Sequence, residues 1–285
     1  LHYLTRLSAN DTIELLYERI TYMLVLIKGA GDLATGVAVR LKRAGMDIVM
    51  TDLAKPSAIR RSVAFSEAMY HGTAKVESIT AVLVPDAETA KAVITQGNIP
   101  ILADETGRTA LTLCPDAMVD AIIAKRNTGT SISDAPVVIA LGPGFTVGTD
   151  CHAAVETKRG HYMGRVYYEK GQSPIPNTGI PGIIAGRGAE RVMHAPACGV
   201  FHCIHAIGDR VKAQETVAIV GGKEVKAQID GTLRGLLPDG FYAAEGMKCA
   251  DVDPRCEYEH CFSCSDKSLA MGGAVLEAIM HFTGK

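Results

Sequence analysis

A glycine-rich turn between two apolar segments constrains the fold of this 285-residue chain more than any other feature. The segment Val25–Leu53 reads VLIKGAGDLATGVAVRLKRAGMDIVMTDL, with one apolar run before the turn and another near its end. The first run, Leu24–Ile27, predicts a buried strand, and the residues around Val37 and Leu41 predict a helix with its basic side chains outside. Gly45 ends that helix, and the run DIVMTD predicts the next strand.

Strands and helices continue to alternate through the first half of the chain. Apolar runs predict further strands at 79–84, 99–104 and 135–142, and they predict helices at 86–94 and Val119–Lys125. Alternation at this spacing predicts an α/β fold, a Rossmann-like doubly wound parallel sheet. We therefore expect residues 23–150 to form a Rossmann-like nucleotide-binding domain.

The composition changes after Cys151. Glycine and proline crowd the following loops, and residues 195–253 consist of short β-like runs separated by glycines. These runs predict a small all-β unit, which resembles the barrel-sandwich fold of biotinyl and lipoyl carriers. We expect residues 151–253 to form a β-rich domain that contains this unit, and 254–285 to form a cysteine-rich turn and a C-terminal helix. Ser265 or Asp266 is the expected cap of that helix.

The first 22 residues precede the first predicted strand, and a nucleotide-binding domain of this kind requires nothing before that strand. The chain begins with leucine, and Met23 stands directly before the first predicted strand. We expect the native chain to start at Met23 and residues 1–22 to be a mis-annotated or dispensable extension. The alternative is a genuine helix that Asn10 or Asp11 caps.

Composition limits the location and the partners of the chain. Apolar residues make up 47% and charged residues 21%, as is typical of a globular protein. No apolar run reaches the roughly 20 residues that span a bilayer, and the N-terminus does not read as a secretory signal. We therefore expect a cytoplasmic protein without membrane contacts, whose eight cysteines are mostly reduced thiols or metal ligands. The net charge of −2 provides no basic footprint for nucleic acid.

The glycine turn has the arrangement that binds dinucleotides. Gly29, Gly31 and Ala34 fit the spacing G-x-G-x-x-G/A, which permits a tight turn, close approach of a phosphate and close packing of the helix. Free N–H groups at the start of that helix attract a pyrophosphate. Asp52 ends the next strand, where an acidic residue binds a ribose hydroxyl and favours NAD over NADP. FAD and S-adenosylmethionine proteins use a similar arrangement, so the identity of the ligand stays open.

A second group of reactive side chains follows the strand predicted at 135–142. It lies at the carboxyl edge of the predicted sheet, where open α/β folds bind ligands, and its Gly-Pro-Gly turn is suited to an anion. The predicted cofactor-binding residues are Gly29, Ala30, Gly31, Asp32, Ala34, Asp52, Gly142 and Gly144. The catalytic candidates are Asp150, His152, Glu156 and Arg159. His152 and Glu156 stay together whether this segment is a strand or a helix. The alternative is a solvated polar turn.

The last cysteines have the spacing of metal ligands. Cys256, Cys261 and Cys264 form a C-x4-C-x2-C pattern, and Cys249 lies upstream. Because no cysteine follows Cys264, these four would together hold an iron–sulfur cluster or zinc. The alternative is a turn of reduced cysteines that binds no metal.

Five stretches of the chain together resemble a known family. They are VLIKGAGDLATGVAVRL, GPGFTVGTDCHAAVETKRGHYMGRV, PNTGIPG, IDGTLRGLLPDG and DVDPR…CFSCSDKSLAMGGAVLEAI, and they extend from Leu24 to Ile279. In combination they resemble the YqeB-type accessory proteins of selenium-dependent molybdenum hydroxylases. The first half is also similar to the xanthine dehydrogenase accessory proteins that service the molybdenum cofactor.

The resemblance implies a role in the maturation of a selenium-dependent molybdenum hydroxylase. Its partners would be the hydroxylase or its cofactor-assembly proteins, and its ligand NAD or molybdopterin dinucleotide. In such a role, Cys151 or Cys261 is a candidate to carry sulfur or selenium on a thiol of lowered pKa. Two other hypotheses remain open: an NAD-dependent oxidoreductase of a small metabolite, and a scaffold that delivers a cofactor without catalysis. The sequence leaves open whether the chain is an enzyme and whether it forms a homo-oligomer.

Overall fold

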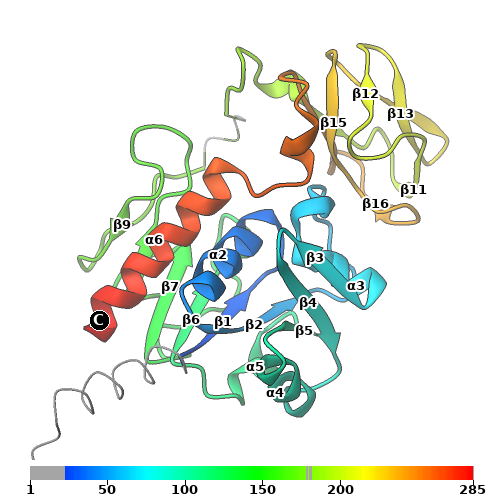
Figure 1. The fold of residues 1–285 in the computed structure, drawn as a ribbon. Coiled ribbons are helices and arrows are strands. Elements are labelled where there is room, and N and C mark those ends of the chain that lie inside the picture. Colours follow the sequence, from blue (N-terminus) through cyan, green and yellow to red (C-terminus); the bar gives the residue numbers. More distant parts are fainter. Residues whose placement is uncertain (1–22, 178, 180–181, 285) are drawn as a thin grey trace, which may run out of the picture.

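The structure, a computed structural model, describes residues 23–177, 179 and 182–284. The extension predicted at 1–22 lies outside the described residues. The described chain has two parts, a large mixed sheet with helices on both faces and a smaller β-rich part (Figure 1). Among the described helices, none is long and apolar enough to cross a membrane.

A nine-stranded sheet organises the first part. Its spatial order is β3, β4, β5, β2, β1, β6, β7, β8, β9. The seven inner strands are parallel, whereas β3 and β9 pair antiparallel at the two edges. The strands are β1 (Leu24–Lys28), β2 (Asp47–Asp52), β3 (Thr73–Val76), β4 (Ile79–Val84), β5 (Ile99–Ala103), β6 (Ala117–Asp120), β7 (Val137–Leu141), β8 (Ala153–Val155) and β9 (Val166–Tyr167).

The predicted layout of a Rossmann-like doubly wound sheet followed by a barrel-sandwich-like unit is wrong. In the doubly wound order the strands follow one another outward from the centre, but here β5 lies between β2 and β4. The sheet is mixed, and the fully described segment between β6 and β7 contains no helix. Periodicity in the sequence predicts individual elements, whereas the order of strands depends on contacts between distant segments.

The helix predicted at Val119–Lys125 is also wrong. Val119 and Asp120 belong to β6, where they pair with β1 on one side and β7 on the other. Ile123 and Lys125 have φ angles of 59° and 63°, which an α-helix excludes. Pairing with two neighbouring strands therefore decided the conformation of this short apolar run.

Helices cover both faces of the large sheet. The last helix of the chain, α6, lies beside α2 on one face, and α4 and α5 lie on the other (Figure 1). Successive residues of β1 follow this division, because Val25 and Ile27 join the core under α2 and α6 while Leu26 joins the opposite core. The helices are α2 (Asp32–Arg43), α3 (Ala68–His71), α4 (Ala87–Thr95), α5 (Arg108–Leu111) and α6 (Asp266–Thr283), with 3-10 turns η1 (Arg61–Val63), η2 (Phe65–Glu67), η3 (Ala189–Arg191) and η4 (Tyr258–Cys261).

Two glycines permit the close contact between α2 and α6. A Cβ atom on Gly36 would lie 2.5 Å from the Cβ of Ser268, and one on Gly272 would lie 2.7 Å from the carbonyl oxygen of Gly36. Ser265 caps α6, as predicted, and accepts a hydrogen bond from the N–H of Ser268 at 3.1 Å. The C-terminal helix therefore completes the core that the first helix begins.

The β-rich part consists of two four-stranded antiparallel sheets, ordered β10, β17, β15, β12 and β14, β13, β11, β16. They enclose one core, in which Phe201 and Leu233 are fully buried. Ile59, from the loop that follows β2, joins this core and accepts a hydrogen bond from the N–H of Leu236 at 2.8 Å. The strands are β10 (Val192–His194), β11 (Gly199–Cys203), β12 (Arg210–Val211), β13 (Thr216–Val220), β14 (Lys223–Lys226), β15 (Gly231–Leu236), β16 (Tyr242–Ala243) and β17 (Lys248–Asp253).

Candidate functional site

A cavity of about 510 Å³ lies where β1, β2, β5 and β6 end. The carboxyl edge of parallel strands is the usual ligand-binding side of an α/β sheet. Six of the eight predicted cofactor-binding residues line this cavity: Gly29, Ala30, Gly31, Asp32, Ala34 and Asp52. The other two, Gly142 and Gly144, lie outside its lining and pack against Thr157 and Arg126.

The two glycines of the turn have different roles. Gly29 has a φ of 92°, and a Cβ atom there would lie 3.0 Å from the carbonyl oxygen of Ala121, so the position requires glycine. Gly31 has a φ of −65°, which any residue adopts, and nothing lies within 4 Å of the position of its Cβ. Gly29 therefore shapes the backbone, while the missing side chain of Gly31 keeps the cavity open.

The start of α2 presents N–H groups to the cavity. Gly31 is the N-cap of α2, and none of the described side chains caps this end of the helix. The N–H groups of a helix's first turn lack acceptors within the helix, and the helix dipole makes this end positive. Gly31, Asp32 and Leu33, which carry these groups, all line the cavity. The turn is therefore suited to an acceptor or an anion.

Asp52 holds the turn in place. Its Oδ2 accepts a hydrogen bond from the N–H of Ala30 at 2.9 Å, and its Oδ1 accepts one from the N–H of Leu53 at 2.8 Å. Burial raises the pKa of Asp52, and these two hydrogen bonds offset part of that effect. Each carboxylate oxygen keeps a second lone pair, so Asp52 can also accept from a ligand hydroxyl.

The charged side chains around the cavity are all acidic. Asp32, Asp52, Asp104 and Glu105 line it, and no lysine or arginine is among the described residues that do so. Burial would raise the pKa of Asp104, but hydrogen bonds from Thr106 and from backbone N–H groups of α5 outweigh it and lower the pKa. Only the backbone of α2 therefore offers positive potential here, while the side chains accept hydrogen bonds from a ligand.

A buried polar network that sequence analysis missed lies behind the turn. Nζ of Lys28, at the end of β1, donates to Oγ1 of Thr130 at 2.9 Å, and that hydroxyl donates to Oδ2 of Asp120 at 2.6 Å. Lys28 and Asp120 are 2% and 1% exposed, and burial raises the pKa of Asp120. The network anchors the segment after β6, which forms one wall of the cavity. A lysine inside an apolar strand was the signal available in the sequence.

The side chains of the predicted catalytic residues Asp150 and His152 accept hydrogen bonds from nearby groups of the protein. Asp150 accepts hydrogen bonds from the N–H of Thr146 at 2.8 Å and from the side-chain amide of Asn127 at 3.1 Å. Nδ1 of His152 accepts from the N–H of Val138 at 2.9 Å, so its neutral ring carries the proton on Nε2. Neither residue lines the cavity.

Glu156 and Arg159, the other two catalytic candidates, are also engaged elsewhere. Glu156 is fully buried and accepts from the N–H groups of Lys158 at 2.6 Å and Ile175 at 2.7 Å. The guanidinium of Arg159 donates to both carboxylate oxygens of Asp266, at 2.7 and 3.0 Å. The structure does not bring the four candidates together at the cavity.

The four cysteines predicted as metal ligands do not converge either. The thiols of Cys249, Cys256 and Cys261 donate to three different carbonyl groups, of Met193, Pro254 and Leu233. Among the described residues, no three His, Cys, Asp or Glu side chains are placed to hold a metal ion.

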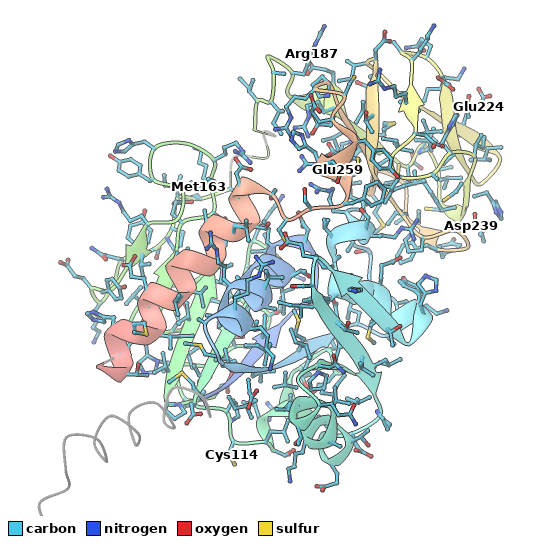
Figure 2. All side chains as sticks on the ribbon, in the orientation of Figure 1. Cys114, Met163, Arg187, Glu224, Asp239 and Glu259 are labelled. Atoms are coloured by element: carbon cyan, nitrogen blue, oxygen red, sulfur yellow. The ribbon has the colours of Figure 1, made fainter. Side chains whose placement is uncertain are left out.

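The pKa values of the cysteine thiols also do not favour a carrier of sulfur or selenium. Burial raises the pKa of Cys151 to about 12 and that of Cys264 to about 11, and it raises the pKa of Cys261 as well. A carrier of sulfur or selenium needs the opposite shift. Cys114 is an exposed cysteine, but it lies far from the cysteine-rich turn. Figure 2 shows it at the opposite end of the first part from Glu259, which belongs to that turn.

These observations define an α/β protein with an acidic ligand cavity at the carboxyl edge of its sheet, joined to a β-rich part. No family model matches the chain. The uncharacterized protein YqeB of Escherichia coli (strain K12) is 46% identical over 259 residues, which cover 91% of this chain and 48% of that protein. The chain is a homologue of YqeB, so the resemblance to YqeB-type proteins is confirmed. It spans about half the length of this relative.

Solved structures match the chain only distantly. TcdA (CsdL) is 11% identical with a TM-score of 0.32, over 97% of this chain and 95% of that chain. An aspartoacylase family protein from Mesorhizobium loti is 13% identical with a TM-score of 0.24, over 81% and 84% of the two chains. Similarity at this level carries no argument about fold or function.

Proposed function

We propose that the protein binds a dinucleotide-type ligand, NAD or molybdopterin dinucleotide, at the glycine turn. The observation that supports this proposal is the start of α2, where uncapped N–H groups open onto a cavity of about 510 Å³. Ligand cavities of roughly 300–1,000 Å³ accommodate small molecules of this kind. The backbone amides of Gly31 and Leu33 would hold a phosphate, and Asp52 would accept from a ribose hydroxyl.

The acidic side chains refine the choice of ligand. Glu105, which is exposed at the rim, would accept hydrogen bonds from ring N–H groups of a pterin or a purine. Asp32 lies close to the expected phosphate, so the ligand's negative charge must be held by the backbone or shared with a cation. The cavity therefore favours ligands that are rich in hydrogen-bond donors.

We further propose that ligand binding serves the maturation of a selenium-dependent molybdenum hydroxylase. The support for this role is the resemblance of the five sequence stretches to YqeB-type accessory proteins. The oxidoreductase hypothesis has weaker support, because none of the four catalytic candidates lines the cavity. The accessory role needs no catalytic group at the turn.

Ligand binding is tested by calorimetric titration of NAD, NADP and molybdopterin dinucleotide. In the variant Gly31→Val the backbone is unstrained, but the new side chain extends into the cavity, so we expect binding to be lost. Gly273→Val is the matched control, because Gly273 is exposed on α6 with nothing within 4 Å of its Cβ position. Unchanged binding by Gly31→Val would refute the proposed site.

The accessory role is tested in a host that carries both the gene and the hydroxylase. Deletion of the gene should lower the selenium content of the purified hydroxylase, and the parent gene but not Gly31→Val should restore it. A hydroxylase with normal selenium and normal activity after deletion would contradict this role.

A further inference from the structure

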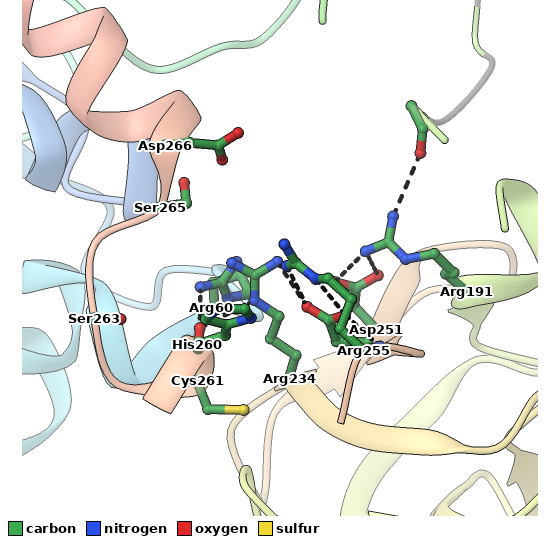
Figure 3. Close-up of polar contacts among 12 residues, drawn as sticks. Arg60, Arg191, Arg234, Asp251, Arg255, His260, Cys261, Ser263, Ser265 and Asp266 are labelled. Atoms are coloured by element: carbon green, nitrogen blue, oxygen red, sulfur yellow. Dashed lines mark hydrogen bonds and ion pairs between the residues drawn. The ribbon is translucent and has the colours of Figure 1, made fainter. Parts of the chain in front are cut away.

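Four arginines from distant segments meet where the two parts of the molecule join (Figure 3). We call them the arginine cluster: Arg60 in the loop after β2, Arg191 in η3, Arg234 in β15 and Arg255 after β17. The cluster is distinct from the glycine-turn cavity, since none of the four arginines lines that cavity.

Two carboxylates serve these four cations. Arg191 donates to both oxygens of Asp251, at 3.1 and 3.2 Å. Arg255 donates to both oxygens of Asp253, at 2.9 and 2.6 Å, and Arg234 reaches the same carboxylate at 3.3 Å. The pairing therefore leaves an excess of two positive charges.

Backbone carbonyl groups accept hydrogen bonds from only some of the remaining guanidinium N–H groups. Nε of Arg234 and a terminal nitrogen of Arg60 both donate to the carbonyl oxygen of His260, at 3.1 and 3.3 Å. Nε of Arg60, Nε of Arg191 and Nδ1 of His260 are buried and have no partner within the described part of the chain. Buried polar groups of proteins are nearly always hydrogen-bonded, so the two guanidinium N–H groups, which can only donate, indicate a missing acceptor.

The cluster is desolvated but still accessible. The side chains of Arg191 and Arg234 each keep only 7% of their surface exposed, whereas that of Arg255 keeps 37%. Burial lowers the pKa of Arg234 to about 10, and repulsion by the charge of Arg60 adds to this effect. An anion that enters beside Arg255 would relieve this repulsion.

We propose that the arginine cluster is a binding site for a phosphate-type dianion. Such an anion matches the excess of two charges, and its tetrahedral oxygens accept from N–H groups that approach from different directions. A single carboxylate would neutralise one charge and leave the other buried. This site goes beyond the proposed function, because it requires no ligand at the glycine turn.

The first test is thermal unfolding of the full chain with inorganic phosphate, against potassium chloride of equal ionic strength. Phosphate at about 100 times its Kd should raise Tm by roughly 5 °C, and the chloride should not. Equal effects of the two salts would overturn the proposal, because they would indicate general screening.

Variants locate the effect. Arg60→Met should abolish the phosphate shift and leave Tm without phosphate unchanged or higher, because it removes a repulsive charge while Arg234 still serves the His260 carbonyl. A purely structural role for Arg60 predicts a lower Tm instead. The matched control is Arg210→Met, an exposed arginine of β12, which should keep the full shift. A shift that persists in Arg60→Met would overturn the proposal.

Arg60→Lys gives a second measurement that does not depend on Tm. It keeps the charge but lacks the planar fork, so equilibrium dialysis should show phosphate binding that is weaker than in the parent but still detectable, unlike in Arg60→Met. Gly31→Val should bind phosphate as the parent does, and loss of binding in that variant would place the anion at the glycine turn. A polyglutamate peptide that displaces phosphate from the parent would assign the cluster to an acidic protein partner and overturn the proposal.

Discussion

The glycine-turn cavity and the arginine cluster bind by opposite means. The cavity offers backbone N–H groups from consecutive residues, surrounded by carboxylates, whereas the cluster offers guanidinium groups from segments up to 195 positions apart, Arg60 and Arg255. One loop joins them, because Pro56, Ser57 and Ala58 line the cavity and Arg60 follows shortly after. One molecule with a net charge of −2 therefore carries two sites of opposite character, a cavity whose charged side chains are acidic and a cluster of arginines.

The same contrast appears in two aspartates. Burial raises the pKa of Asp52 beside the cavity. Burial also opposes the charge of Asp253 in the cluster, but the hydrogen bonds and charge of Arg255 and the charge of Arg234 lower its pKa to about 2. The surroundings, not the residue type, therefore determine which protonation state is favoured.

The largest expected effect is on the arginine cluster. Arg191→Met leaves the buried carboxylate of Asp251 without its cation, which should lower the free energy of unfolding by about 4 kcal/mol. Urea unfolding measures the loss. The double variant Arg191→Met/Asp251→Asn should recover most of it, and a single variant as stable as the parent would show that the pair is not desolvated.

At the glycine turn, Gly29→Ala should cost roughly 3 kcal/mol. The φ of 92° strains any other residue, and the new Cβ meets the carbonyl of Ala121. Gly31→Ala, two residues away, should change the stability by less than about 1 kcal/mol because its backbone is unstrained. Similar urea midpoints for the two variants would contradict the different roles assigned to the glycines.

Acid should weaken the cluster. Because the pKa of Asp253 is lower in the folded chain, its contribution is present above the unfolded pKa of about 4 and is lost as pH falls to about 2. The expected loss is about 2 kcal/mol in the free energy of unfolding. Urea unfolding between pH 5 and 2 measures it, and Asp253→Asn should show a flatter dependence on pH.

The smallest effect is expected at Asp52, and it has the opposite sign. Its raised pKa means that the folded chain binds the proton more tightly, so this residue's contribution falls as pH rises above about 4. Asp52→Asn should remove that dependence, but its amide nitrogen cannot accept, so one of the two hydrogen bonds from backbone N–H groups is lost, a net change of about 1 kcal/mol. A steeper dependence on pH in this variant would contradict the assignment.

Much of the turn and its neighbouring elements could be predicted. The strand at Leu24–Lys28, the helix at Asp32–Arg43 and the strand ending at Asp52 follow from apolar periodicity and turn chemistry, which act over a few residues. The second group of candidates could not be resolved in this way. Asp150 and Glu156 are acidic residues in loops. Only the folded structure shows that backbone N–H groups donate hydrogen bonds to their carboxylates, which are therefore already engaged.

The sequence by itself determined the glycine turn, the acid at the end of the next strand and the relationship to YqeB, because each depends on residues that are close in the chain or on direct identity. Tertiary structure alone decided the mixed order of the sheet, the packing of α6 on α2 and the assembly of the arginine cluster. These features depend on contacts between segments far apart in the chain, and local patterns carry no information about which distant segments will meet.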